Sequence, residues 1–301
     1  MILQPSNQTN LFGLEYYFTE LVNLYSKDNL PNKILLSGEK GIGKCTLSYH
    51  LINYVLSFDE EYSYNLKEFK INQENKSNPN FILVDVAEEK KNIDINQIRN
   101  LILTLNKSSF NLKPRFVLID NIELLNINSV NAMLKILEEP NNNIYFVLIN
   151  NNKRILPTLK SRCLNFKISL TRDQLFEITN KILDFNLKDL LNKELITNYI
   201  TPGQILKMID FANKNDINLK DSNLKKIISQ IIMNKIYKKD TSIKNLLYSL
   251  IELYFRNNIS INNIKLISLH NYFLKKINET KIFNLDEESL FMEFQDSVLN
   301  G

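Results

Sequence analysis

Residues 38–46 read GEKGIGKCT, a stretch that decides the fold because it nearly matches the phosphate-binding P-loop G-x-x-x-x-G-K-[ST]. The matching residues, together with one further glycine, are Gly38, Gly41, Gly43 and Lys44. The apolar run 33–37 precedes the loop and a stretch with helical spacing follows it, which is the context that the motif requires. We therefore expect backbone N–H groups and the Lys44 ammonium to surround phosphate oxygens, rather than a plain strand-to-helix turn with a solvated lysine.

The last position of the motif departs from the pattern. Cys45 stands where a nucleotide-hydrolysing protein carries the hydroxyl that binds Mg²⁺. Thr46 supplies a hydroxyl one residue later, but one residue along a helix turns the side chain by about 100°. We therefore expect that residues 38–46 could bind ATP or ADP, with or without Mg²⁺, but would not hydrolyse it. We expect no cofactor to be required.

A second acidic element follows the apolar strand 116–119. Asp120 comes directly after it and could hold Mg²⁺ through water, or it could be a carboxylate that caps the strand end. The next residue is Asn121, whose amide is a poor base. Glu123 lies two residues further on, where we expect the chain to have turned away.

Strand and helix signals alternate through the first half of the chain. Short apolar runs at 33–37, 81–86, 116–119, 144–149 and 164–168 alternate with helical spacing at 45–58, 93–105 and 129–137. This pattern predicts an α/β fold in which helices cover both faces of a parallel sheet. After about residue 170 only helical patterns follow, at 174–185, 187–199, 204–213, 224–236, 243–257 and 261–278. We expect three domains: a P-loop domain at 1–167, a small helical lid at 168–212 and an all-α domain at 213–301.

Composition narrows the class of protein. The 301 residues are 44% hydrophobic and 23% charged, with a net charge of +4, which is ordinary for a soluble globular protein and does not argue for nucleic-acid binding. No apolar run reaches the length of a membrane span, and the N-terminus does not resemble a signal peptide. The only two cysteines, Cys45 and Cys163, are far apart, which disfavours a disulfide framework and a four-ligand zinc site. A cytoplasmic location fits best.

Two further sequence motifs become informative when they are considered together with the glycine loop. They are NAMLKILEEP at 131–140 and LPTLKSRC at 156–163, and alone they read as an amphipathic helix and a basic loop. In this order, with GEKGIGK and the strand that ends at Asp120, the set resembles the clamp-loader branch of the AAA+ proteins, most of all the delta-prime subunits of bacterial DNA polymerase III. The resemblance covers about residues 1–210. It implies an AAA+ P-loop domain, a helical lid and a C-terminal oligomerisation collar.

The resemblance also implies roles for individual residues. Arg162, in Ser-Arg-Cys, matches an arginine finger that reaches the γ-phosphate of ATP bound to a neighbouring subunit. Asn150 or Asn151 lies where the family keeps a polar nucleotide-sensing residue. Gln204 stands where active members place an arginine that touches the bound phosphate. The four-cysteine zinc module of many relatives has no counterpart in residues 59–80, so we expect no zinc and no other metal.

The hydrolytic elements are weakened while the finger is kept. This asymmetry predicts a largely non-hydrolysing subunit of the polymerase holoenzyme that helps to load the sliding clamp onto primed DNA. Its implied partners are the clamp-loader ATPase (gamma/tau) and delta, with the clamp and primed DNA reached through the complex and no membrane. The alternative is an active ATPase, such as a gamma/tau-like subunit or another AAA+ loader. A P-loop kinase is disfavoured because it gives no role to the two later phrases.

Overall fold

The computed structural model divides the chain into two compact units. A sheet unit comprises Leu3–Ile178 and Thr201–Gly203, and a helical unit comprises Thr179–Ile200 and Gln204–Gly301. The structure describes residues 4–57, 79–87, 90–107, 112–138, 143–196, 200–238, 241–259, 264–283 and 285–300. Most of the segment 59–80, for which we predicted no zinc, lies outside these residues, as do the last two residues of NAMLKILEEP.

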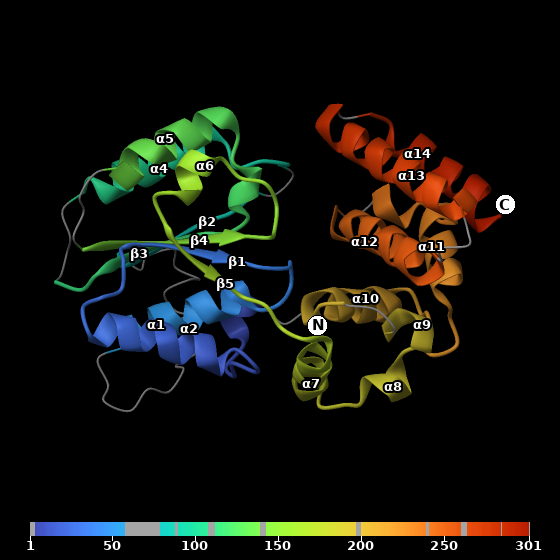
Figure 1. Ribbon diagram of the computed structural model, residues 1–301, viewed down its shortest axis with the longest axis horizontal. Coiled ribbons are helices and arrows are strands. Elements are labelled where there is room, and N and C mark those ends of the chain that lie inside the picture. The colour runs from blue at the N-terminus through green and yellow to red at the C-terminus, as the bar shows by residue number, and fades with distance from the viewer. Residues whose placement is uncertain are drawn as a thin grey trace. The chain divides into compact units, whose positions relative to one another are not determined.

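Five strands form one parallel sheet with the order β2-β3-β4-β1-β5. Their bounds are Lys33–Ser37 (β1), Phe81–Val84 (β2), Arg115–Ile119 (β3), Ile144–Asn150 (β4) and Leu164–Lys167 (β5). Because all five strands run the same way, the segments that follow them meet at one edge of the sheet (Figure 1). The GEKGIGKCT loop leaves this edge next to the end of β4, since Gly38 N donates to Asn150 O at 3.2 Å.

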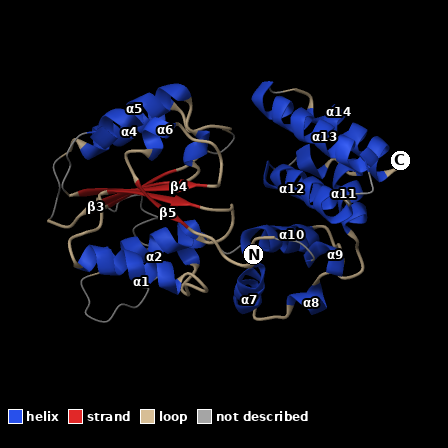
Figure 2. Cartoon of the chain, viewed as in Figure 1, coloured by secondary structure: helices blue, strands red, loops and turns tan. Residues whose placement is uncertain are grey.

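Helices cover both faces of the sheet (Figure 2). On one face lie α1 (Glu15–Ser26) and α2 (Lys44–Leu56). On the other lie α4 (Ile95–Leu105), α5 (Ile127–Glu138) and α6 (Pro157–Lys160). The sheet unit also contains the short 3₁₀ turns η1 (Pro5–Asn7) and η2 (Ile122–Leu124), and α7 (Arg172–Leu183) begins in it.

The core of the sheet unit follows the alternation of side chains along the strands. Leu35, Val117 and Leu148 point to the layer of α4, α5 and α6 and are almost completely buried there. A capping box starts α4: the Asp94 carboxylate accepts from the backbone N–H groups of Asn96 and Gln97. The Gln97 side-chain amide also donates to Asp85 O at 2.7 Å, so this helix start fixes the chain just after β2.

The helical unit contains no strand in its described part. Its elements are α8 (Leu187–Leu190), α9 (Lys193–Ile196), α10 (Pro202–Lys214), α11 (Leu224–Met233), η3 (Ile236–Lys238), α12 (Thr241–Asn258), α13 (Ile264–Phe283), α14 (Glu287–Phe294) and the π-helical turn η4 (Gln295–Leu299). Buried isoleucines of α11, together with Phe291 and Phe294 of α14, supply its interior.

The fold class and the parallel sheet predicted from the sequence are confirmed. One predicted helix, 187–199, is wrong: Leu191 is extended and Asn192 accepts a hydrogen bond from Glu194 N, so the chain breaks between α8 and α9. Helices α1 and α14 were not predicted. The boundaries of the three predicted domains stay a prediction, because the structure separates only two compact units.

Candidate functional site

The glycine loop has the backbone shape that its sequence predicts. Gly41 and Gly43 have φ of +87° and +101°, a region that side chains rarely adopt, and α2 starts at the next residue, Lys44. The first N–H groups of α2 therefore point into the loop, together with the positive end of the helix dipole. This arrangement can bind a phosphate group.

Lys44 is only 3% exposed, and its ammonium lies inside the loop. Its Nζ donates to Gly38 O at 2.9 Å and to Glu39 O at 2.7 Å. Burial lowers the pKa of Lys44 to about 8, and the negative charges of Asp120, Glu123 and Glu39 oppose that shift. Phosphate oxygens are stronger partners for an ammonium than backbone carbonyls, so the lysine can exchange these bonds for a bound anion.

Cys45 faces Asp120, as the P-loop pattern predicts for residue 45 and the strand-end acid. Burial, and after it the negative charge of the nearby Asp120 carboxylate, raise the pKa of Cys45 well above its ordinary value. The pKa of Asp120 is raised to about 6, first by burial and then by the charge of Asp85. Because Mg²⁺ prefers oxygen ligands, a neutral thiol in this place is a poor substitute for a hydroxyl.

Asn121 is held at both ends of its side-chain amide. Its Nδ2 donates to Asp85 Oδ1 at 2.8 Å, and its Oδ1 accepts from Asn151 Nδ2 at 2.9 Å. Asn121 has φ +56°, which asparagine tolerates better than most residues, and its backbone N–H donates to Asp120 Oδ1 at 2.8 Å. The carboxyl-terminal end of β3 is therefore linked to the carboxyl-terminal ends of β2 and β4 by hydrogen bonds of amide groups.

Glu123 belongs to the same network, and the expectation that the chain turns away before it is wrong. The 3₁₀ turn η2 brings Glu123 back, so that its carboxylate accepts from Asn151 Nδ2 at 2.8 Å and from Asn151 N at 3.3 Å. Asp85, to which the sequence analysis gave no role, is a second carboxylate in this network. Its only signal in the sequence is its position at the end of an apolar run.

The two asparagines proposed as sensing residues differ in their surroundings. Asn151 joins the network of Asn121 and Glu123, whereas Asn150 exchanges two hydrogen bonds with the backbone of Lys153 and closes a turn. Only Asn151 is thus placed among the strand-end groups. The Thr46 side chain is half-buried on α2.

The start of α10 contacts the glycine loop directly. Thr201 Oγ1 donates to Lys40 O at 2.8 Å, and Gly203 N donates to Gly41 O at 2.9 Å. A Cβ at Gly203 would lie 2.8 Å from the Cα of Gly41, so glycine is needed for this approach. Gln204 is the next residue, half-buried at the third position of α10 and assigned to the helical unit.

Arg162 is separate from these groups. It follows α6, which lies beside α5 in the layer opposite α2 (Figure 1), and its side chain is 32% exposed. The guanidinium donates from Nη1 to Thr158 O at 2.8 Å and forms an ion pair through Nη2 with Glu138. The structure therefore brings Lys44, Cys45, Asp120 and Asn151 together and leaves Arg162 on another surface.

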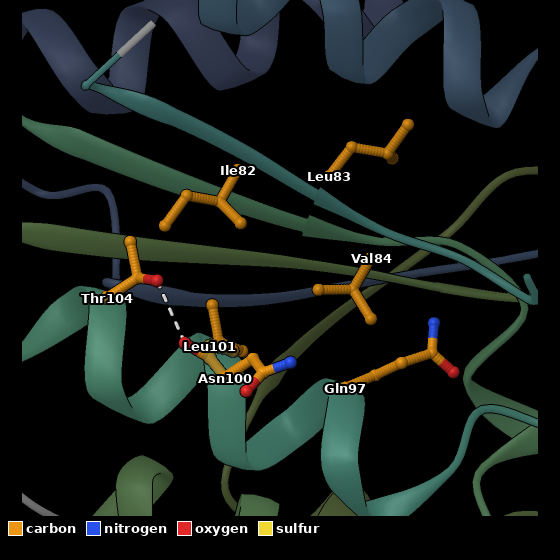
Figure 3. A pocket seen from close by; sticks show the side chains of 7 residues that line it. All are labelled: Ile82, Leu83, Val84, Gln97, Asn100, Leu101 and Thr104. Atoms are coloured by element: carbon orange, nitrogen blue, oxygen red, sulfur yellow. Dashed lines mark hydrogen bonds between the residues drawn. The ribbon is translucent and has the colours of Figure 1, made fainter. Parts of the chain in front are cut away.

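A pocket of about 260 Å³ lies elsewhere, between β2 and α4 (Figure 3). Its lining residues are Ile82, Leu83, Val84, Gln97, Asn100, Leu101 and Thr104. None of these side chains is ionisable, so the pocket offers no acid, base or nucleophile. The candidate site is the loop with the strand ends.

Neither a metal-binding cluster nor a membrane-spanning helix is found among the described residues. No group of three or more His, Cys, Asp or Glu side chains there is placed to hold a metal ion. None of the helices described is both long and apolar enough to cross a membrane.

Comparisons with known proteins point to replication. DNA polymerase III subunit gamma of Buchnera aphidicola subsp. Schizaphis graminum is 30% identical over 231 residues, which are 73% of this chain and 62% of that protein, so the chain spans less than two thirds of this relative. Subunit delta' of the same organism is 25% identical over 276 residues, covering 87% of this chain and 83% of that one.

The fold agrees with these relatives. The crystal structure of a DNA polymerase III gamma-subunit-related protein from Thermotoga maritima matches with a TM-score of 0.50 at 18% identity, covering 90% of this chain and 96% of that chain. A family model described as "DNA polymerase III, delta subunit" matches residues 14–171. Since this match covers more than half of the 301 residues, the chain belongs to the DNA polymerase III delta subunit family.

Proposed function

We propose that the chain is a delta-prime-like subunit of the DNA polymerase III clamp loader. In this role it does not hydrolyse ATP itself but donates Arg162 to a neighbouring ATPase subunit. Its partners are the gamma/tau and delta subunits, and through the complex it acts on the sliding clamp and primed DNA. Several DNA polymerase III subunits of the gamma and delta' types are similar to the chain, and these similarities support the proposal.

One observation carries the non-hydrolysing part: Asn121 occupies the place of the catalytic acid, and both polar atoms of its amide are bonded. Nδ2 donates to Asp85 and Oδ1 accepts from Asn151, so this side chain does not present a base to a water molecule. The Cys45 thiol next to Asp120 adds to this, because it removes an oxygen ligand for Mg²⁺.

The same loop retains what a bound nucleotide needs. Gly41 and Gly43 keep the left-handed conformations of a phosphate loop, and Lys44 supplies the positive charge. ATP or ADP would therefore be held by the loop N–H groups and Lys44 as a ligand that stabilises the fold by mass action. The loop offers hydrogen-bond donors to phosphate oxygens, but residue 45 lacks the hydroxyl that would bind Mg²⁺.

The surroundings of Arg162 are consistent with a subunit contact. The guanidinium is partly exposed, and two large apolar side chains close to it in the chain, Leu156 and Leu164, are 45% and 44% exposed. Arginine and exposed apolar side chains are both frequent in protein interfaces. At such a contact the guanidinium would stabilise the charge that develops on the γ-phosphate of the neighbour's ATP.

The test is a clamp loader reconstituted from this chain with the gamma/tau and delta subunits of the same organism. Arg162→Ala should remove the part of the DNA-stimulated ATP turnover that comes from the neighbouring site to which Arg162 is donated. Assembly, measured by gel filtration, should stay intact. Unchanged turnover in an intact complex would refute the arginine finger.

The alternative function is an active ATPase subunit of the gamma/tau type, which the 30% identity to a gamma subunit favours. Steady-state ATP hydrolysis by the isolated chain discriminates between the two. The delta-prime-like role predicts no turnover above that of Lys44→Ala, whereas turnover that Lys44→Ala abolishes would establish the ATPase. A Cys45→Thr variant, measured beside it, reports whether the missing hydroxyl limits hydrolysis.

A further inference from the structure

Arg162 follows a short helix, α6, which is anchored in the hydrophobic core. In α6, Leu159 is 2% exposed and belongs to the hydrophobic core beneath α5, and Cys163 packs against the same core. The backbone on both sides of Arg162 is therefore anchored, while its side chain reaches the surface. What remains to be fixed is the direction of a long side chain with several rotatable bonds.

Two groups on this surface fix that direction. Thr158 O accepts from Nη1 at 2.8 Å, and the carboxylate of Glu138, the last residue of α5, pairs with Nη2. Glu138 comes from an element 24 residues away in the chain, so the pair joins α5 to α6 across the surface. A cation here also faces the negative end of the α5 dipole.

We propose that Glu138 is a positioning residue for Arg162, which orients the guanidinium toward the neighbouring subunit. The inference rests on the proposed function of Arg162. A guanidinium has five N–H donors, and the two contacts described use one donor on each of Nη1 and Nη2, which leaves three for phosphate oxygens. Glu138 thus restrains the side chain without consuming its capacity to bind an anion.

The pair is exposed, which sets the size of the effect. The side chains of Arg162 and Glu138 are 32% and 54% exposed, and ion pairs of this kind contribute little to stability. Glu138→Gln should therefore leave folding and assembly unchanged. In the reconstituted complex it should lower kcat for the Arg162-dependent part of ATP turnover, defined as the difference between wild type and Arg162→Ala, about two- to fivefold with an unchanged KM for ATP.

A double-mutant cycle separates positioning from a general structural effect. In the Arg162→Ala background, Glu138→Gln should have no further effect on turnover, because Glu138 acts only through the arginine. Glu252→Gln is the matched control, since Glu252 pairs with Arg256 at similar exposure in the helical unit, and it should leave turnover unchanged.

The outcomes distinguish the two claims. If Arg162→Ala lowers turnover but Glu138→Gln does not, the finger stands and the positioning role is overturned. Faster turnover of Glu138→Gln also overturns it, since the pair would then restrain the finger away from its target. If Arg162→Ala itself has no effect, the proposed function fails first.

Discussion

Restoring the acid that the family pattern expects at position 121 should destabilise this protein rather than activate it. The change is Asn121→Glu. Asn121 has φ +56°, a conformation that costs most side chains about 1 kcal/mol more than asparagine. The substitution also breaks the hydrogen bonds to Asp85 and Asn151, at about 1 kcal/mol each.

Charge adds to this cost. The Asn121 amide nitrogen lies 2.8 Å from Asp85 Oδ1, so a carboxylate there would face Asp85 at close range. Two like charges at about 4 Å repel by about 4 kcal/mol at an effective dielectric constant of 20, although rotation of a side chain or uptake of a proton relieves much of this. We therefore expect a loss of about 2–4 kcal/mol in the free energy of unfolding of the sheet unit.

The assay is urea unfolding followed by circular dichroism, since the chain has no tryptophan. Asn121→Asp tolerates the left-handed conformation but keeps the repulsion, and Asn121→Gly removes the strain together with the side chain. The double variant Asp85→Asn/Asn121→Glu should recover at least about 1 kcal/mol relative to additivity. An Asn121→Glu protein as stable as wild type, or one indifferent to Asp85→Asn, would refute the reasoning.

Two further predictions concern the loop and the strand ends. Because the pKa of Asp120 is about 6 when folded and 3.8 ordinarily, its contribution favours folding at low pH and is lost as the pH rises through 6. The free energy of unfolding of Asp120→Asn, which cannot ionise, should therefore rise by about 1–3 kcal/mol relative to that of wild type as the pH increases from about 4 to about 6, measured by urea unfolding; a difference that stays constant over this range would contradict this. Gly203→Ala should cost about 1–3 kcal/mol and weaken the melting shift with ADP, because its Cβ would lie 2.8 Å from a backbone atom of Gly41. Thr201→Val, which removes the hydrogen bond from the Thr201 hydroxyl to Lys40 O, should cost less, and equal losses in the two variants would contradict the steric explanation.

The sheet and the loop could be predicted because their signals are local. The apolar run 33–37 followed by GEKGIGK specifies strand, turn and helix within about 20 residues, and the structure places β1 and α2 accordingly. The strand-end network could not be predicted in this way. Asn121 meets Asp85 across 36 residues of sequence, and their contact exists only once β2 and β3 pair in register.

Prediction from local sequence patterns failed where a single side-chain hydrogen bond sets the path of the chain. A 3₁₀ turn returns Glu123 to Asn151, and Asn192 interrupts a run whose apolar spacing continues as a helix would. The pairing of Arg162 with Glu138 is of the same kind. Each of the two residues belongs to a recognisable sequence motif, but neither motif predicts that the end of α5 lies beside α6.

The neutral side chains of Cys45 and Asn121 at the strand ends have a physical reason that does not depend on the proposed lack of hydrolysis. Three carboxylates gather there, Asp85, Asp120 and Glu123, and the raised pKa of Asp120 has the charge of Asp85 as its second cause. Lys44 is the buried cation nearest to them in the loop, and its own pKa is lowered to about 8 by burial.

A hydrolysing site needs a further acid and a hydrated metal to balance it; without the metal, that acid would only add repulsion. The amide at 121 thus replaces an acid whose charge would oppose folding, and the thiol at 45 adds no charge of its own. Under the proposed function, in which a neighbouring subunit hydrolyses ATP, the chain can keep the phosphate-binding shape of the loop and gain stability at the strand ends, because activity is often retained at the cost of stability.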